Sequence, residues 1–298
     1  MGITNNCAKF LFYSKSIGVS FNETLMLGRL RLYANRSHIE YCINKFNNND
    51  KNINQVKFND EYSEPLFEIL GARLVESLDF SDYEKASIIH DLNLPLPEKY
   101  YNSFSAIVDG GTIEHVFNFP AAIKNCMSAL KVGGNYLGIT PVNNSMGHGF
   151  YQFSPELYYR VFSIENGFRI KKMFIYAYGD DDEDITWYEV ADPKNVKDRV
   201  TITNSIPTYL LVVAEKLSDK SIFTIIPQQS DYTNTWAING LTTQNTSEQN
   251  KLFSFYRKFT PKRIKVILRN LYDIIYKEKT DTIDLGTINP IHFKKFEL

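Results

Sequence analysis

Short apolar runs separated by polar turns follow one another through the first 216 residues. Each run is rich in Val, Ile or Leu and ends in turn residues, a pattern that predicts buried β-strands. The predicted strands lie at residues 23–30, 73–79, 86–93, 104–111, 135–141, 170–178 and 207–216. The hydrophobic pattern alone therefore predicts a protein built around a sheet.

Helical spacing marks the segments between several of these strands. The predicted helices lie at residues 64–71, 120–134 and 154–168. The second helix has Ala122, Ile123, Met127 and Leu130 at helical spacing. Gly71, Gly133-Gly134 and Gly167 are expected to end the three helices. Ser154 is the predicted N-cap of the third, with Pro155 at its first position. Alternating strands and helices predict an α/β fold with a parallel sheet, helices on both faces and ligands at the strands' carboxyl ends.

Three polar segments interrupt or follow this pattern. Residues 44–60 are rich in Asn and predict a surface insertion, and the acidic run 180–184 lacks the spacing of a Ca²⁺ loop and predicts a solvated loop. The tail from Lys251 carries eleven basic and five acidic residues and contains an amphipathic helical pattern. We therefore predict one domain over residues 1–216 and a C-terminal extension with a basic helix over residues 217–298.

Composition excludes several classes of protein. Hydrophobic residues make up 43% of the chain and charged residues 22%, which is the composition of a folded globular protein. The net charge is −1, which argues against a generally basic nucleic-acid binder. No apolar stretch is long enough for a membrane span, and the N-terminus lacks the apolar core of a secretory signal. Three scattered cysteines predict reduced thiols and a cytoplasmic location.

A series of motifs between Arg73 and Pro141 carries a family resemblance. In order they read VESLD, IIHDLNLPLP, FSAIVDGGTIEHV and ALKVGGNYLGITP. Their order and spacing resemble those of class I S-adenosylmethionine-dependent methyltransferases. The run NSMGHGFYQFSPELYYRVF, residues 144–162, is similar to methyltransferases of surface-polysaccharide biosynthesis. The resemblance covers roughly residues 20–216. It implies a Rossmann-like, mostly parallel sheet of seven strands with an antiparallel last strand, and S-adenosylmethionine as cofactor.

The first motif departs from the family pattern. The family has a Gly-rich turn after the first strand, where this chain has Gly28 alone. Glycines there let the backbone approach the cofactor closely. Arg29 or Arg31 would then be a charge partner for the methionine carboxylate of the cofactor.

The resemblance also implies the rest of the cofactor site. Asp79 would accept the ribose hydroxyls, and Asp91 the adenine amine beside the Leu92 amide. The turn Asp109-Gly110-Gly111 would lie near the reactive sulfonium, a cation that carboxylates attract. Plain turn capping competes with the cofactor role at each aspartate.

Two histidines are candidate catalytic bases toward an acceptor hydroxyl. His115 follows the fourth strand, and a helix-start His bonded to the backbone is the alternative. His148 lies between two glycines in the loop after the fifth strand, where Tyr151 and Gln152 could bind the acceptor. Some relatives bind a metal through an E-x-x-E-H motif, but its first position here is Gly111, so no metal site is predicted.

These observations predict a methyltransferase that acts on an oxygen of a sugar, glycan precursor or glycan-linked group. A non-catalytic scaffold or regulatory partner with the same fold is the alternative, and a nucleotide-binding enzyme of another class is disfavoured because GxGxxG and P-loop motifs are missing. The expected partner is a small-molecule or glycan acceptor. The basic tail could also contact an anionic membrane surface or a second subunit.

Overall fold

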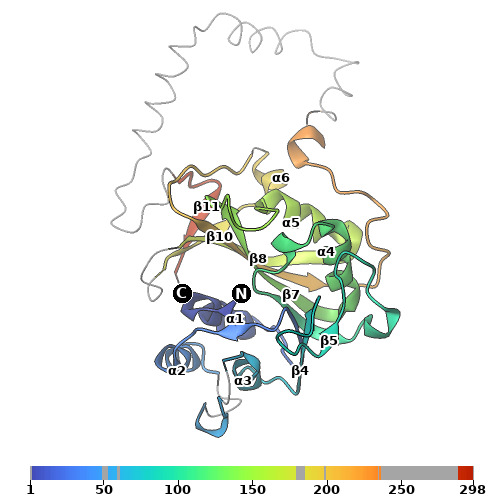
Figure 1. Cartoon of the computed structure of the whole chain (residues 1–298). Coiled ribbons are helices and arrows are strands. Elements are labelled where there is room, and N and C mark those ends of the chain that lie inside the picture. The colour runs from blue at the N-terminus through green and yellow to red at the C-terminus, as the bar shows by residue number, and fades with distance from the viewer. Residues whose placement is uncertain are drawn as a thin grey trace, which may run out of the picture.

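A nine-stranded sheet forms the centre of the molecule (Figure 1). The computed structural model describes residues 2–48, 53–58, 61–178, 185–197, 199–233, 235 and 288–297. The strands, in chain order, are β2 (Glu23–Leu27), β4 (Leu74–Asp79), β5 (Ile88–Ile89), β6 (Phe104–Asp109), β7 (Leu130–Asn143), β8 (Phe168–Ala177), β9 (Trp187–Val190), β10 (Thr208–Lys216) and β11 (Phe293–Phe296). Across the sheet they run β11-β9-β8-β10-β7-β6-β2-β4-β5. A small separate sheet pairs β1 (Gly2–Ile3) with β3 (Arg31–Leu32).

The strand directions confirm part of the predicted topology. Neighbouring strands from β5 to β7 pair in parallel, and β10 is antiparallel to both β7 and β8. The predicted count of seven is wrong, because β9 and β11 extend the sheet beyond β8 as antiparallel strands. Both are only four residues long, too short for the hydrophobic pattern to separate them from loops.

Helices cover both faces of the sheet, as predicted. One face carries α1 (Asn5–Ser16), α2 (Arg36–Lys45) and α3 (Glu64–Ile69), and the other carries α4 (Phe119–Ala129) and α5 (Pro155–Val161). Successive residues of β10 point to opposite sides, with Leu210 and Val212 in one core and Leu211 and Val213 in the other. The continuous apolar runs of the sequence follow from this burial on both faces.

Shorter elements complete the part of the chain that the structure describes. They are α6 (Pro193–Val196) and the 3₁₀ turns η1 (Ile53–Gln55), η2 (Glu98–Tyr100), η3 (Ile113–His115) and η4 (Ile164–Asn166). The turn η3 follows β6 directly and so stands at the carboxyl edge of the sheet.

Local signals predicted the start of α5 well and the end of α4 poorly. The Ser154 side chain accepts a hydrogen bond from the Leu157 amide. The prediction that Gly167 ends this helix is wrong: α5 ends at Val161, and Gly167, with a left-handed φ of +79°, ends the separate turn η4. The prediction that Gly133-Gly134 ends the preceding helix is wrong. The helix ends at Ala129, and Leu130 already begins β7.

The polar segments differ in outcome. Within residues 44–60, Ile53 and Val56 are buried in the core beside α1, so this stretch is more than a surface insertion. The acidic run 180–184 and the predicted basic helix lie outside the described residues. In the part that is described, no helix has the length and apolar character needed to cross a membrane. Cys7, Cys42 and Cys126 are free thiols and are buried.

Candidate functional site

The carboxyl ends of the central strands meet at one edge of the sheet. Leu27 at the end of β2 pairs with Leu78 of β4 on one side and with Asp109 of β6 on the other. Asp109 in turn pairs with Gly138 of β7. This register places the segments that follow β2, β4, β6 and β7 side by side, where ligands bind in open α/β sheets.

The turn after β2 is built around Gly28. Its φ of +73° lies in the left-handed region, which glycine adopts without strain. The Gly28 amide donates to the Leu78 carbonyl at 2.7 Å, and the Thr112 hydroxyl donates to the Leu27 carbonyl at 2.6 Å. The Thr112 side chain therefore ties the turn after β6 to the end of β2, and the Gly28 amide ties the turn after β2 to β4.

Asp109 lies beneath the edge and is fully buried. Its Oδ2 accepts the Tyr136 hydroxyl at 2.7 Å, and its Oδ1 accepts the Thr112 and Ile113 amides at 2.8 and 3.3 Å. Burial raises the pKa of this carboxyl although these hydrogen bonds act in the opposite direction. One oxygen thus holds the turn that leads into η3, and the other ties it to Tyr136 of β7.

Asp79 and Asp91 each cap a turn. Asp79 Oδ1 accepts the Ser81 amide at 3.3 Å, and Asp91 Oδ1 accepts both the backbone and side-chain nitrogens of Asn93 at 2.9 and 2.7 Å. These contacts are the turn-capping alternatives considered from the sequence. They do not use every carboxylate lone pair, so the predicted cofactor contacts stay predictions. Leu92 is buried, and its carbonyl accepts from the Asn125 side chain.

Arg29 is held by protein groups. Its guanidinium lies 3.9 Å from the centre of the Tyr62 ring, pairs with Glu64 at 2.6 Å and donates to the Glu84 carbonyl at 3.2 Å. Arg31 pairs with Glu61 and Glu84. The predicted contact between Arg29 and a cofactor carboxylate would have to compete with these partners.

The loop after β7 folds back onto η3. The amides of Phe150 and Tyr151 both donate to the Glu114 carbonyl, at 2.8 and 3.3 Å. Gly149 has a φ of +76°, and a Cβ there would lie 2.8 Å from that carbonyl oxygen and 3.1 Å from His115 Nδ1. Only glycine therefore allows this close approach without a shift.

The predicted acceptor-binding side chains help to fix the same loop. The Tyr151 hydroxyl donates to the Phe117 carbonyl at 2.7 Å, and Gln152 Oε1 accepts the Ser145 amide at 2.8 Å. Both side chains already have protein partners, so a role in binding an acceptor stays a prediction.

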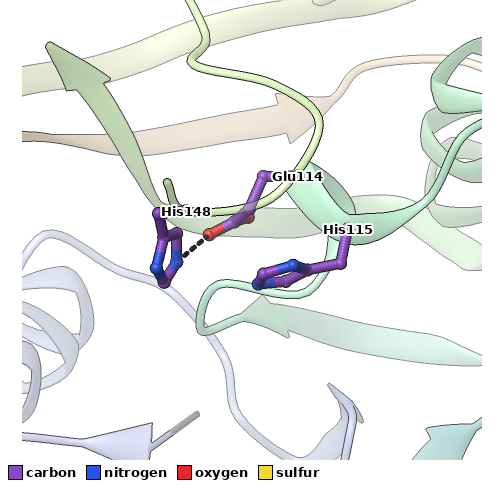
Figure 2. A group of neighbouring side chains, drawn as sticks. All are labelled: Glu114, His115 and His148. Atoms are coloured by element: carbon purple, nitrogen blue, oxygen red, sulfur yellow. Dashed lines mark ion pairs between the residues drawn. The ribbon is translucent and has the colours of Figure 1, made fainter. Parts of the chain in front are cut away.

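Three side chains converge between η3 and this loop: Glu114, His115 and His148 (Figure 2). The Glu114 carboxylate points toward His148, with 3.4 Å between Oε1 and the imidazole Nε2. The two imidazole rings lie 5.0 Å apart, centre to centre. One potential ligand atom of each residue lies within 4.8 Å of those of the other two.

The cluster is buried at its base and open at its top. The Glu114 side chain is 0% exposed, and neither carboxylate oxygen has a hydrogen bond within the described structure. The His148 side chain is 43% exposed. Burial, with the nearby Asp109 charge, raises the pKa of Glu114 to about 8, and burial together with His148 lowers the pKa of His115.

Sequence reasoning found two of these three residues and missed the third. His115 and His148 were separate candidates 33 positions apart, and the structure brings them together. Glu114 is the second Glu of the E-x-x-E-H pattern, and the sequence gives it no role because the first position of that pattern is Gly111.

Comparison with solved structures finds matches at low sequence identity and low TM-score. No family model and no curated protein sequence matches. The branched-chain polyamine synthase of Thermus thermophilus, solved with N4-aminopropylspermidine and 5′-methylthioadenosine, is 14% identical with a TM-score of 0.35. That match covers 76% of this chain and 61% of the synthase, so this chain spans about three-fifths of its length.

Two further solved structures match. The YcgJ protein of Bacillus subtilis is 9% identical with a TM-score of 0.36, over 71% of this chain and 99% of that one. The 1,6-didemethyltoxoflavin-N1-methyltransferase of Burkholderia thailandensis, solved with S-adenosylhomocysteine, is 10% identical with a TM-score of 0.31, over 71% and 77%.

Proposed function

We propose that this protein is an S-adenosylmethionine-dependent methyltransferase. The observation that carries the proposal is the cluster of Glu114, His115 and His148 at the carboxyl edge of a mostly parallel sheet. This edge is where the motif resemblance expects the methyl donor. A cluster that can accept a proton beside it supplies the group that a hydroxyl acceptor requires.

The proposed mechanism divides the work between two groups of residues. The backbone turns at Gly28 and Gly110-Gly111, with the Asp79 and Asp91 carboxylates, would hold the cofactor. S-adenosylmethionine would supply an activated methyl group at this edge, and an imidazole would take the proton of the acceptor oxygen that receives it. His115 suits this step because its lowered pKa keeps it neutral, the form that accepts a proton. Positioning of donor and acceptor would supply much of the rate.

The acceptor we propose is an oxygen of a sugar, glycan precursor or glycan-linked group in surface-polysaccharide biosynthesis, within the cytoplasm. The support is the resemblance of residues 144–162, which form the loop over the cluster and the helix α5. Phe150 of this loop and Phe117 are both exposed, and their ring centres lie 5.8 Å apart. Such rings offer apolar faces to an acceptor.

Binding and turnover test the proposal separately. S-adenosylmethionine or S-adenosylhomocysteine at 100 times its dissociation constant should stabilise the protein by about 2.7 kcal/mol in thermal denaturation. Transfer of labelled methyl groups to sugar acceptors should fall about 10²-fold in His115→Gln or His148→Gln, with cofactor binding retained. Unchanged turnover in both single variants and in the double variant would refute the base assignment.

A non-catalytic scaffold is the second candidate. The observation that favours it is the turn after β2, which has one glycine and an arginine already paired with Glu64. A scaffold would show no thermal shift with either cofactor form. Its contact with a partner would then be sought in the basic segment from Lys251 onward.

A further inference from the structure

We propose that Glu114, His115 and His148 bind a divalent transition-metal ion. Two imidazole nitrogens and one carboxylate oxygen are a ligand set that Zn²⁺ and its first-row neighbours accept, and three protein ligands leave a coordination position for an exchangeable oxygen. The prediction of no metal site rested on Gly111 within a local motif. The structure supplies a ligand from a different segment, the loop after β7.

The distances fit such an ion with little rearrangement. Ligand atoms about 2.0–2.1 Å from a tetrahedral ion lie roughly 3.3 Å from one another. Glu114 Oε1 and His148 Nε2 are already 3.4 Å apart. The ligand atom of His115 lies within 4.8 Å of the others, and its exposed ring can close the remaining distance by side-chain rotation.

The buried carboxylate is the second, independent observation. A fully buried carboxylate is ordinarily hydrogen-bonded, paired with a cation or bound to a metal. Within the part of the chain that the structure describes, neither Glu114 carboxylate oxygen has a hydrogen bond, and the carboxylate points toward His148 (Figure 2). A bound ion would satisfy this carboxylate.

Backbone contacts hold the ligands in place without the ion. The Phe150 and Tyr151 amides bind the Glu114 carbonyl, and Gly149 allows the loop that carries His148 to touch η3. The exposed side of His148 leaves the open coordination position facing solvent, where an oxygen ligand can enter. The site is therefore preorganised and accessible.

Metal binding is independent of the proposed methyl transfer. If both hold, the imidazoles act as ligands rather than bases, and the ion polarises the acceptor hydroxyl in their place. If methyl transfer survives chelation, an imidazole accepts the proton of the acceptor hydroxyl. If chelation abolishes transfer and Zn²⁺ restores it, the bound ion promotes loss of that proton.

Calorimetric titration of the chelator-treated full-length protein with ZnCl₂, in excess Mg²⁺ and without cofactor, tests the proposal. Mg²⁺ occupies sites made only of oxygen ligands, which prefer hard cations. We expect one Zn²⁺ per chain, and an affinity at least about 10-fold lower in His148→Gln and in His115→Gln. His90→Gln is the matched control, because this His lies outside the cluster and its ring contacts the Leu94 carbonyl.

Co²⁺ provides a second readout, because its visible absorption is stronger in a four-coordinate protein site than in the hydrated ion. The spectrum should appear with wild-type protein and His90→Gln and be lost in the His115→Gln, His148→Gln double variant. Both imidazoles are partly exposed, so circular dichroism should show these variants folded. Zn²⁺ binding that is absent, or equal in the wild type and the double variant, would overturn the proposal whatever the outcome of the cofactor experiments.

Discussion

At the scale of single residues, the site depends on two buried carboxyls of different use. Asp109 accepts hydrogen bonds from the Thr112 and Ile113 amides at the start of η3 and from the Tyr136 hydroxyl of β7. Glu114, five residues later, accepts no hydrogen bond from any described residue at its carboxylate, and its Oε1 faces His148. Two acidic residues close together in the chain thus have different uses. Asp109 supports the structure and Glu114 is a candidate for the chemistry, and the groups that contact each carboxyl distinguish the two.

Asp109 should make the stability of the protein depend on pH. Its pKa is raised in the folded state by burial, so the stability it contributes is present below the unfolded pKa of about 4 and is lost as pH rises through the folded value. Asp109→Asn keeps an acceptor for the Thr112 amide and can donate to the Tyr136 hydroxyl oxygen, without a charge to bury. The gain in melting temperature of the variant over wild type should therefore grow from pH 4 to pH 7.

Thermal denaturation at a series of pH values measures this effect. Asp82→Asn, at an exposed carboxylate, serves as the control and should leave the wild-type curve unchanged. If the melting temperatures of Asp109→Asn and wild type change in parallel with pH, Asp109 has the same pKa in the folded and unfolded states, and the prediction is wrong. In Asp109→Asn the Asp109 charge no longer raises the pKa of Glu114. This also makes the variant lose less stability than wild type as the pH rises.

The candidate site could be predicted from the sequence only as separate pieces. Asp109 lies at the end of a predicted strand, and His115 and His148 follow predicted strands, so their place at the carboxyl edge follows from strand order alone. The burial of Glu114 and its contact with His148 do not, because they depend on how a glycine-containing loop packs onto η3. Spacing along the chain contains no information on such loop geometry.

At the scale of elements, a single polar side chain can determine where a helix beside the sheet begins. The Asn35 side-chain oxygen accepts the His38 amide at 2.8 Å and so begins α2. Asn35→Ala should lower the free energy of unfolding by about 1 kcal/mol, because that amide loses its partner. Asn35→Asp retains the acceptor and should stay close to wild type. Urea denaturation measures both variants, and equal losses in the two would show that the cap contributes nothing specific.

The same scale explains which elements the sequence predicts. The strands are recognisable because both of their faces are buried. Helix α1 is not, because every residue from Asn6 to Ser14 is buried, the polar Asn6, Lys9 and Ser14 included, so the apolar and polar positions have no helical period. Helix α2 has only His38, Ile39 and Cys42 buried, too few to mark an apolar face. Both helices therefore emerge from tertiary packing rather than from the local pattern.

At the scale of the whole molecule, the two ends of the chain meet on the sheet (Figure 1). Phe296 of β11 packs against Tyr13 of α1 and Phe174 of β8, with ring centres 5.5 and 4.7 Å apart. Residues 293–296 fall within the predicted C-terminal extension, yet they pair with β9 and complete the edge of the sheet. Contacts this distant in sequence leave no periodic signal, which is why the hydrophobic pattern did not predict this strand.

The contribution of β11 can be measured with two neighbouring substitutions. Phe293 is 4% exposed in the core beside α4 and α5, whereas Lys294 is exposed on the same strand. Phe293→Ala should destabilise the protein by about 3 kcal/mol or more, since it removes a buried ring and leaves a cavity. Lys294→Ala keeps the backbone pairing of β11 with β9 and should lie within about 0.5 kcal/mol of wild type. Equal unfolding midpoints for Phe293→Ala and wild type would mean that the C-terminal strand does not belong to the cooperative core, because a ring buried there cannot be removed without cost.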